Sequence, residues 1–262
     1  MPITGRTRLF GILADPIAQV RAPEVFNALF AERGIDAVFV PFHLGSRDLA
    51  AAWPAFKAMQ NLGGLIATVP HKAACATLCD ALEPAGRMIG AVNTIRREPD
   101  GRMTATMFDG DGFVAGLRAE GHEPRGKRVL LLGAGGAGSA VAFALAAAGV
   151  ARLALANRTR GKAERLAAEI RNWFPDAPVV VGDADPTNAD IVVNTTSLGM
   201  NEGDPLPIAV ETIPPAALVA EIIMKPATTP LLAAAEACGN SIHHGRHMLD
   251  QQIPLMADFL KI

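Results

Sequence analysis

The sequence predicts an α/β protein made of two α/β domains with a ligand-binding cleft between them. Short apolar runs recur along the 262 residues and alternate with helical patterns, which favours mostly parallel sheets covered by helices. The pattern restarts near Val129, after a first group of candidate strands that ends near Met107. A chain of this length can bury a core in each half. Enzymes of this architecture bind ligands between domains, so we expect the functional site there.

The first half contains five candidate strands and two candidate helices. A helical pattern from about Glu24 ends at Gly34, because glycine readily adopts the left-handed conformation that closes a helix. A second helix is expected from about Lys72 to Leu82. The polar turn Glu98–Gly101 joins the last two strands as a hairpin. The strands are Leu9–Ala14, Ala37–Phe42, Gly64–Val69, Ala91–Arg96 and Arg102–Met107.

The second half is expected to form a sheet of its own with helices between the strands. A last helix begins at about Met248, and we expect it to pack back on the first half. The first domain is therefore placed at residues 1–107, completed by residues 244–262, and the second at residues 108–243. The strands of the second half lie near residues 129–132, 152–156, 178–181, 190–194 and 218–222.

The segment Val129–Thr159 has the order of a dinucleotide-binding βαβ unit, with an apolar run, the turn GAGGAG, a helix and a second apolar run. Gly133 permits the tight turn, and Gly135 and Gly136 let the backbone approach a pyrophosphate. Gly138 lets the helix and the strand pack closely. The N–H groups at the helix start then bind the phosphate charge.

The end of the second apolar run indicates which nucleotide fits. An acidic residue there would accept a hydrogen bond from a ribose 2′-hydroxyl, whereas Arg158 can pair with a 2′-phosphate. Lys162 follows four residues later and can reach the same phosphate, although it is equally consistent with a solvated helix charge. The expected cofactor is therefore NADP rather than NAD.

Composition excludes several other classes of function. A net charge of −2 supplies no field for a polyanion, so nucleic acid is not an expected partner. No apolar run is long enough to span a membrane, and the N-terminus lacks a signal-peptide core, so we expect a cytoplasmic protein with no membrane partner. His243 and His247 have a helical ligand spacing, but no carboxylate motif accompanies them, and no metal is expected.

Two polar residues of the first half lie where a strand ends, which is where ligands bind in open α/β sheets. Lys72 follows Pro70 in TVPHK, and Asp109 stands beside two glycines in MFDGDGF. Together they can share a proton with a substrate hydroxyl while a hydride leaves for the nicotinamide. Spacing alone favours a plainer interpretation, in which Lys72 is a solvated lysine and Asp109 a turn residue.

The chain resembles the shikimate dehydrogenase family from Gly11 to Gln252. The matching motifs occur in one order along the chain: PI at Pro16, P..FN at Pro23–Asn27, T.PHK at Thr68–Lys72, GAVNT at Gly90–Thr94, DG.GF at Asp109–Phe113, GAGGAG, NRT at Asn157–Thr159, NTTSLGM at Asn194–Met200, TPLL at Thr229–Leu232 and G..ML..Q at Gly245–Gln252.

The resemblance implies an N-terminal substrate domain, completed by the C-terminal helices, and a Rossmann domain that binds NADP. It implies that Lys72 and Asp109 are the catalytic pair, and that Thr68, Asn93 and Gln252 contact the substrate. The positions implied to hold NADP are Gly133, Ala134, Gly135, Gly136, Ala137, Asn157, Arg158, Thr159, Lys162, Ile222 and Gly245.

The chain departs from the family pattern around the implied substrate pocket. The family holds the substrate carboxylate with two serines in HS.SP, a segment that reads Gln19-Val20-Arg21-Ala22-Pro23 here. Losing two hydrogen bonds to a charged group costs roughly 3–6 kcal/mol, unless Arg21 pairs with the carboxylate instead. Further polar positions of the family pattern are occupied by the apolar residues Ile66, Met107, Phe108 and Met224.

We therefore expect an NADP-dependent alcohol dehydrogenase that acts on a small cyclic hydroxy acid of the shikimate or quinate type, as a monomer or a homodimer. The resemblance implies a place in aromatic amino acid biosynthesis. Two alternatives stay open at this point. The chain is a dehydrogenase for a different, less polar cyclic alcohol, or it is a non-catalytic NADP(H)-binding protein.

Overall fold

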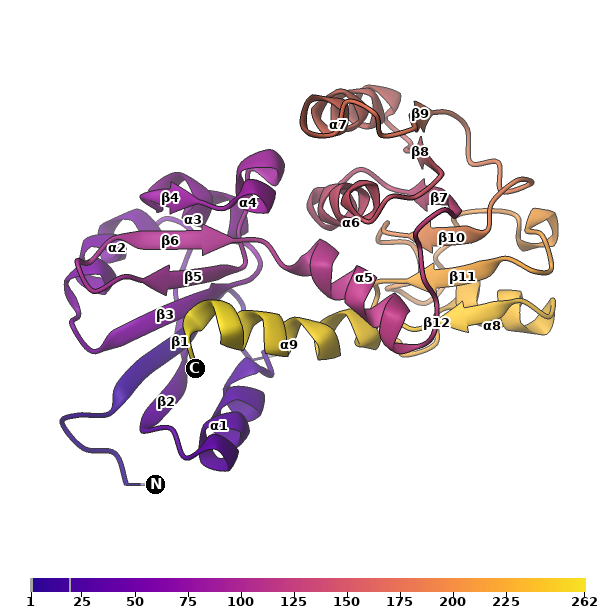
Figure 1. Cartoon of the computed structure of the whole chain (residues 1–262). Helices are drawn as coiled ribbons and strands as arrows, with labels where there is room; N and C mark the ends of the chain where they lie inside the picture. The colour runs from indigo at the N-terminus through magenta and orange to yellow at the C-terminus, as the bar shows by residue number, and fades with distance from the viewer. Residues whose placement is uncertain (1, 19) are drawn as a thin grey trace. The chain divides into compact units, whose positions relative to one another are not determined.

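The computed structural model describes residues 2–18 and 20–262, and the chain divides into two compact α/β units (Figure 1). The first unit contains the described residues up to Phe108 together with Pro254–Ile262, and the second unit is Asp109–Ile253. The predicted α/β class is confirmed. Residues 244–253, which we placed with the first domain, belong to the second unit.

The first unit is built on a six-stranded mixed sheet in the order β2-β1-β3-β5-β6-β4. β1 pairs in parallel with β2 and β3, whereas β5 is antiparallel to both β3 and β6. β4 is parallel to β6, so three of the five strand pairs are parallel, and the predicted hairpin between β5 and β6 brings in the antiparallel pairing. The strands are β1 (Arg8–Ala14), β2 (Ala37–His43), β3 (Leu62–Ala67), β4 (Ala81–Leu82), β5 (Thr94–Arg97) and β6 (Met103–Thr106).

Four helices accompany this sheet, and the sequence predicted two of them. α1 ends at Gly34, whose φ of 65° closes the helix as expected. α3 is shorter than predicted, because Cys79 is extended and the Asp80 N–H donates to the Met103 carbonyl at 2.9 Å, which starts β4. The helices are α1 (Ala22–Arg33), α2 (Leu49–Ala58), α3 (Lys72–Leu78) and α4 (Pro84–Ile89).

The second unit has a six-stranded sheet, all parallel, in the order β12-β11-β10-β7-β8-β9. The five predicted strands are present, and β12 was not predicted. The strands are β7 (Arg128–Leu132), β8 (Arg152–Ala156), β9 (Val179–Val181), β10 (Ile191–Asn194), β11 (Leu218–Glu221) and β12 (Ser241–His243). The helices are α5 (Asp109–Ala119), α6 (Gly136–Ala147), α7 (Arg160–Trp173), the 3-10 helix η1 (Val210–Thr212) and α8 (Pro230–Ala237). α9 (Arg246–Leu260) begins in this unit and ends in the first.

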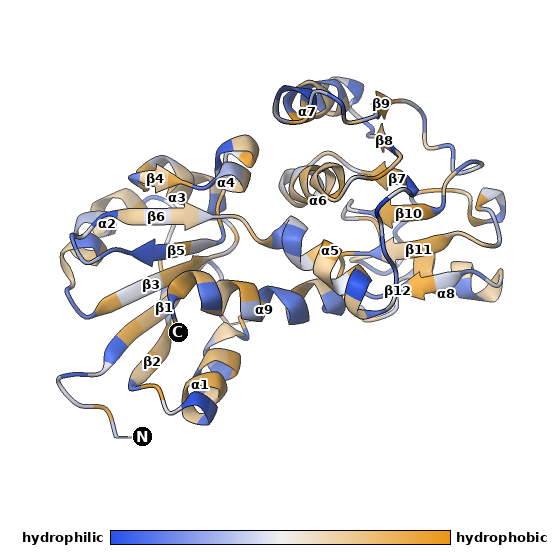
Figure 2. Ribbon diagram, in the orientation of Figure 1, coloured by the Kyte–Doolittle hydropathy of each residue, from blue (hydrophilic) through white to orange (hydrophobic). Residues whose placement is uncertain are grey.

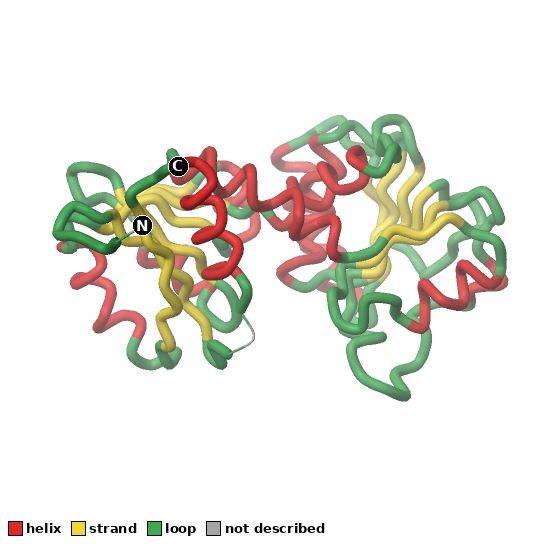
Figure 3. The backbone as a smooth tube through the Cα atoms, turned by 90° about the horizontal axis from the view of Figure 1, so that it is seen from below, coloured by secondary structure: helices red, strands yellow, loops and turns green. Residues whose placement is uncertain are grey.

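Both faces of this sheet are buried, as its nearly continuous apolar strands require. Alternate residues of β7 enter separate cores: Val129 and Leu131 pack with α5, α6 and α7, while Leu130 and Leu132 pack with α8. Figure 2 shows the corresponding apolar strands, and Figure 3 shows the helices beside the sheet. α7 buries one stripe, Ala163, Leu166, Ala167 and Ile170, against the first of these cores.

None of the helices within the described residues is both long and apolar enough to cross a membrane. The described residues also contain no group of three or more histidine, cysteine or acidic side chains arranged to hold a metal ion.

A cluster of histidines surrounds the end of β12. His243 is 1% exposed, and its ring centroid lies 4.8 Å from that of His247 and 6.4 Å from that of His122. Neither ring nitrogen of His243 has a hydrogen-bond partner among the described residues. Burial, followed by the fields of His247, His122 and His244, lowers the pKa of His243 to about 4. Glu120 faces the cluster through His247, with Nδ1 to Oε1 at 3.2 Å.

This burial predicts a loss of stability in mild acid. An unfolded histidine titrates near pH 6.5, whereas folded His243 stays neutral down to about pH 4, so the unfolded chain binds the extra proton. The contribution is fully present above pH 6.5 and falls by roughly 3 kcal/mol as the pH drops to about 4. Urea unfolding at a series of pH values across this range measures the free energy of unfolding. His243→Leu should flatten the curve, exposed His43→Gln should not, and parallel curves for wild type and His243→Leu would contradict the assignment.

Candidate active site and nucleotide site

Three of the predicted site residues of the first unit lie at the carboxyl edge of its sheet. Thr68 directly follows β3, and its N–H donates to the Leu13 carbonyl at 3.1 Å. The His71 N–H donates to the Thr68 carbonyl at 2.7 Å, which turns the chain into α3 with Lys72 as first residue. The Lys72 carbonyl in turn accepts from the Val92 N–H at 3.0 Å. Lys72 is therefore fixed by backbone bonds next to the segment that carries Asn93.

Asn93 is 2% exposed, and backbone and side-chain bonds hold it on both sides. Its N–H donates to the Thr106 carbonyl at 3.0 Å, and its carbonyl accepts from the Ala67 N–H at 2.9 Å. Its Oδ1 accepts from Thr94 Oγ1 and from the Phe108 N–H, both at 3.0 Å. Because Oδ1 is used as an acceptor, the orientation of the amide is set, and Phe108, the residue before Asp109, is anchored.

Asp109 is the first residue of α5 in the second unit, where it is 5% exposed. The two glycines beside it allow close helix packing. A Cβ at Gly110 would overlap the Ala140 carbonyl of α6, and a Cβ at Gly112 would overlap the side chain of Gln252 in α9. The two glycines and Gln252 therefore form one tightly packed group, and Gln252 is buried rather than a surface residue of the last helix.

The segment in which the family has its serines directly precedes and opens α1. Gln19 lies outside the described residues. Arg21 stands at the N-terminus of α1 with its side chain 73% exposed and its Nε 3.7 Å from Glu24 Oε2. An exposed ion pair of this kind contributes little free energy, so the guanidinium is free to change partner.

The glycine-rich loop has the geometry that a pyrophosphate needs. Gly133 has a φ of +107°, and its N–H donates to the Ala156 carbonyl at 2.8 Å. A Cβ at Gly138 would lie 2.6 Å from Thr195 Oγ1 and 2.8 Å from the Gly133 carbonyl oxygen. Beside Gly135 and Gly136, by contrast, the described residues leave open space. No side chain caps the N-terminus of α6, so its N–H groups are available to a phosphate.

Asn157 connects this loop to the start of α7. Its Oδ1 accepts from the Ala134 N–H at 3.0 Å, and its Nδ2 donates to the Thr159 carbonyl at 2.8 Å. Arg158, Thr159 and Lys162 are exposed around the same point. The open loop, the uncapped helix and these exposed cations fit a dinucleotide that carries a 2′-phosphate.

The two remaining positions predicted to hold the nucleotide, Ile222 and Gly245, pack on each other. A Cβ at Gly245 would lie 2.6 Å from the carbonyl carbon of Ile222, so only glycine permits this close approach. The segment that follows β11 is thereby held against the residue that precedes α9.

The sequence interpretation missed a buried polar network at the ends of β10 and β11. Glu221, with no exposed surface, accepts hydrogen bonds from Asn194 Nδ2 at 2.9 Å and Thr229 Oγ1 at 3.1 Å. It also accepts from the N–H groups of Ile222 and Ile223 at 2.9 and 3.3 Å. Burial raises the pKa of Glu221, and these four donors oppose the shift. The available signal was a single acid at the end of the apolar run LVAE.

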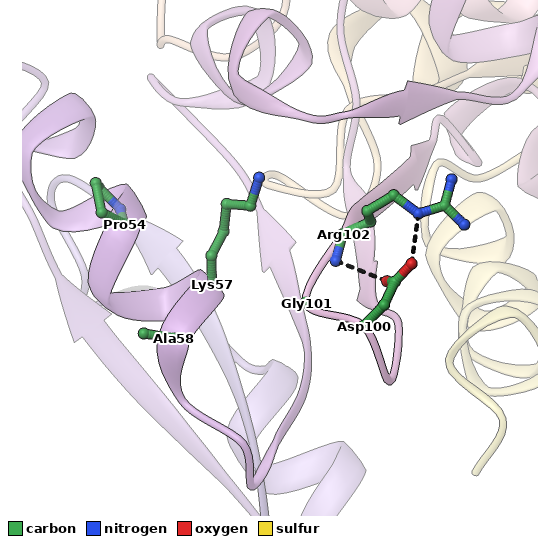
Figure 4. Close-up of a pocket in the computed structure, with 6 residues that line it drawn as sticks. All are labelled: Pro54, Lys57, Ala58, Asp100, Gly101 and Arg102. Carbon is green, nitrogen blue, oxygen red and sulfur yellow. Dashed lines mark hydrogen bonds and ion pairs between the residues drawn. The ribbon is translucent and has the colours of Figure 1, made fainter.

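A surface groove in the first unit contains none of the predicted site residues (Figure 4). Its cations already have acidic partners: Lys57 Nζ lies 2.7 Å from Asp80 Oδ1, and Arg102 Nε lies 2.8 Å from Asp100 Oδ2. The remaining lining residues are Pro54, Ala58 and Gly101.

A glycine-rich βαβ nucleotide unit, joined to a second α/β unit with a lysine at the carboxyl edge of its sheet, defines a nicotinamide-nucleotide-dependent dehydrogenase. Comparison with known proteins gives the family. Residues 12–95 match the family "Shikimate dehydrogenase substrate binding domain", and residues 118–198 match "Shikimate / quinate 5-dehydrogenase". The chain is 37% identical, over 96% of its length and 90% of the relative's, to shikimate dehydrogenase (NADP(+)) of Geobacter metallireducens. The chain belongs to the shikimate dehydrogenase family.

Solved structures agree with this assignment. Shikimate 5-dehydrogenase from Listeria monocytogenes in complex with shikimate and NAD is 31% identical, with a TM-score of 0.90 over 100% of this chain and 97% of that chain. The ligand-free 5-ketofructose reductase of Gluconobacter sp. strain CHM43 is 32% identical, with a TM-score of 0.89 over 98% of this chain and 94% of that chain. The predicted family and fold are confirmed, and the two alternative functions, a less polar cyclic alcohol and a non-catalytic binding protein, are not favoured.

The glycine loop yields a matched pair of expectations. Gly138→Ala should lower the free energy of unfolding by about 1–3 kcal/mol, because the new methyl group meets Thr195 and the Gly133 carbonyl. Gly135→Ala should change stability by less than about 1 kcal/mol, since its φ of −86° suits alanine and the space is open. Thermal unfolding of both variants measures the difference. Equal melting temperatures would show that the loop does not approach Thr195 this closely.

Proposed function

We propose that this protein is an NADP-dependent oxidoreductase that interconverts a ring hydroxyl and a ketone of a shikimate- or quinate-like cyclic hydroxy acid. The observation that carries the proposal is the joint presence of Lys72 at the start of α3 and an open phosphate loop in a chain of this family. The first unit, which includes the end of α9, is the proposed substrate domain, and the second unit the proposed NADP domain.

Lys72 and Asp109 are the proposed catalytic residues. NADP, when bound, accepts a hydride from the carbon that carries the hydroxyl. Lys72 takes the hydroxyl proton as this happens and returns it in the reverse direction. Asp109 orients the hydroxyl. Main-chain hydrogen bonds fix the backbone of Lys72, and the bond from the Phe108 N–H to Asn93 fixes the residue before Asp109.

The proposed substrate contacts are Thr68, Asn93, Gln252 and Arg21. Asn93 and Gln252 are buried amides of fixed surroundings, which suits hydrogen bonds to ring hydroxyls. Arg21 is the proposed contact for the carboxylate, in place of the two family serines. Its weak pairing with Glu24 leaves it able to form a bidentate pair with a carboxylate.

The proposed NADP contacts divide into two groups. The loop of Gly133, Ala134, Gly135, Gly136 and Ala137 holds the pyrophosphate. The N–H groups of Gly133 and Ala134 already donate to Ala156 and Asn157, so the last three residues supply the donors. Ile222 and Gly245 line the opposite end of the nucleotide. Arg158, Thr159 and Lys162 bind the 2′-phosphate, while Asn157 shapes the loop between the two phosphates. We further propose that the protein works in the cytoplasm as a monomer or homodimer, in the aromatic amino acid pathway that the family implies.

A second candidate substrate class is a polar keto sugar without a carboxylate. Val20 and Ala22 stand where the family has carboxylate-binding serines, and the similar Gluconobacter structure is a 5-ketofructose reductase. A substrate that lacks the carboxylate has no need of the two missing hydroxyls.

Turnover on a substrate panel tests the function. NADP-linked oxidation of shikimate or quinate is expected, and Lys72→Ala should lower kcat by about two to four orders of magnitude, because proton transfer is lost. KM should change by less than about threefold if the lysine acts in the transition state. Initial rates, followed by the absorbance of NADPH, give both kcat and KM.

Lys57→Ala, which removes a lysine paired with Asp80 on the surface of the same unit, is the matched control and should leave kcat unchanged. Normal turnover by Lys72→Ala would refute the mechanism. Activity on 5-ketofructose with NADPH that exceeds activity on every cyclic hydroxy acid would establish the second substrate class instead.

Arg158 tests the cofactor assignment. Arg158→Ala should raise the Kd of NADP by about 10- to 100-fold, because a charge-assisted hydrogen bond to the 2′-phosphate is lost, and should leave the Kd of NAD unchanged within about twofold. Calorimetric titration with both nucleotides measures this. Arg152→Ala, an exposed arginine at the other end of β8, serves as control. An equal loss of affinity for NADP and NAD would remove Arg158 from the 2′-phosphate site.

A further inference from the structure

The strand order of the second unit divides the nucleotide site into two halves. Leu132 at the end of β7 pairs with Ala156 on β8 to one side and with Asn194 on β10 to the other, and Asn194 pairs with Glu221 on β11. The phosphate loop follows β7, which is where such a sheet binds a pyrophosphate. Arg158 follows β8, so the 2′-phosphate half extends over β8, and the nicotinamide half must extend over β10 and β11.

Glu221 therefore lies beneath the nicotinamide half, about two strand spacings (~10 Å) from β7. Its carboxylate is surrounded by donors alone. Oε1 accepts the N–H groups of Ile222 and Ile223, and Oε2 accepts from Asn194 and Thr229. An ionised carboxylate accepts these hydrogen bonds on both of its oxygens. The side-chain amide of a glutamine accepts on one side only, and its NH2 group would point toward the N–H or O–H donors on the other side.

The donors belong to three separate segments of the second unit. Asn194 also donates to the Leu198 carbonyl at 3.1 Å and accepts from Thr196 Oγ1 at 2.7 Å, which fixes the loop after β10. Thr229 Oγ1 accepts from the Leu232 N–H at 3.3 Å and so caps α8. Ile222, held by its N–H, packs on Gly245. A single carboxylate thus connects three loops.

We propose that Glu221 is the positioning residue of the nicotinamide end of the site: it holds the segment Ile222–Ile223 and the Asn194 loop in the arrangement that receives the nicotinamide, without touching the nucleotide itself. This inference rests on the proposed function, because it requires NADP as the ligand. It assigns Glu221 to binding and orientation of one half of the cofactor, and Arg158 to the other half.

Glu221→Gln tests the proposal through two ligands that share the phosphate half. NADPH carries the nicotinamide, whereas 2′,5′-ADP lacks it. The variant should raise the Kd of NADPH about tenfold, since a displaced loop loses its contacts, and leave the Kd of 2′,5′-ADP within about twofold. Calorimetry gives both constants, and the fluorescence of bound NADPH reports the nicotinamide environment directly. Glu211→Gln, an exposed glutamate of the same unit, is the matched control and should change neither constant.

The outcomes separate the two proposals. If the wild-type protein binds neither ligand, the proposed function is refuted. If the wild-type protein binds both ligands, and Glu221→Gln changes neither Kd or changes both equally, the role of Glu221 is overturned. If Glu221→Gln does not fold, the variants Thr229→Val and Thr229→Ser test the role of Glu221 instead. Thr229→Val, which removes one donor to Glu221, should weaken NADPH selectively, and Thr229→Ser, which keeps the hydroxyl, should not. Equal Kd values for NADPH in these two variants would also overturn the proposal.

Discussion

The proposed nucleotide site depends on one constraint, the register of four parallel strands that end level with one another: β8, β7, β10 and β11. It places Ala156, Leu132, Asn194 and Glu221 in one row, so that every loop after them leaves the sheet at the same edge. Parallel pairing makes a one-residue slip costly, because both faces of these strands are buried. The proposed nucleotide site, which draws on residues 133 to 245, is therefore held by the same hydrogen bonds that hold the core.

Main-chain hydrogen bonds also fix the proposed site residues of the first unit. Main-chain hydrogen bonds set the places of Thr68, Lys72 and Asn93, and their partners include Leu13, Val92 and Thr106. Because these bonds involve no side chain of the reacting group, the side chains can differ between relatives while their starting points stay fixed.

The features that could be predicted from the sequence are those that local chemistry determines. The unit β7–α6–β8 was recognisable because the apolar runs, the glycines and Arg158 all lie within about thirty residues of one another. The end of α1 followed from Gly34. α2 was missed because Pro54 inside it argues against a helix. The hairpin between β5 and β6 was predicted, but the order of the strands in the first sheet was not, because strand order is set by long-range pairing. The bonds of Glu221 to Asn194 and of Thr195 to Leu132 join residues that are far apart in sequence, so they carry no local signal.

Asn157 and Arg158 are neighbours in the chain but differ in how freely each can be exchanged. The Asn157 amide bridges Ala134 and Thr159, so its replacement disturbs the loop for any nucleotide. The Arg158 side chain is exposed. If Arg158 binds the 2′-phosphate as proposed, nucleotide preference depends on a side chain that the fold does not need, next to one that it does. Such a preference can be redesigned by changing the surface, with the scaffold beneath it left intact.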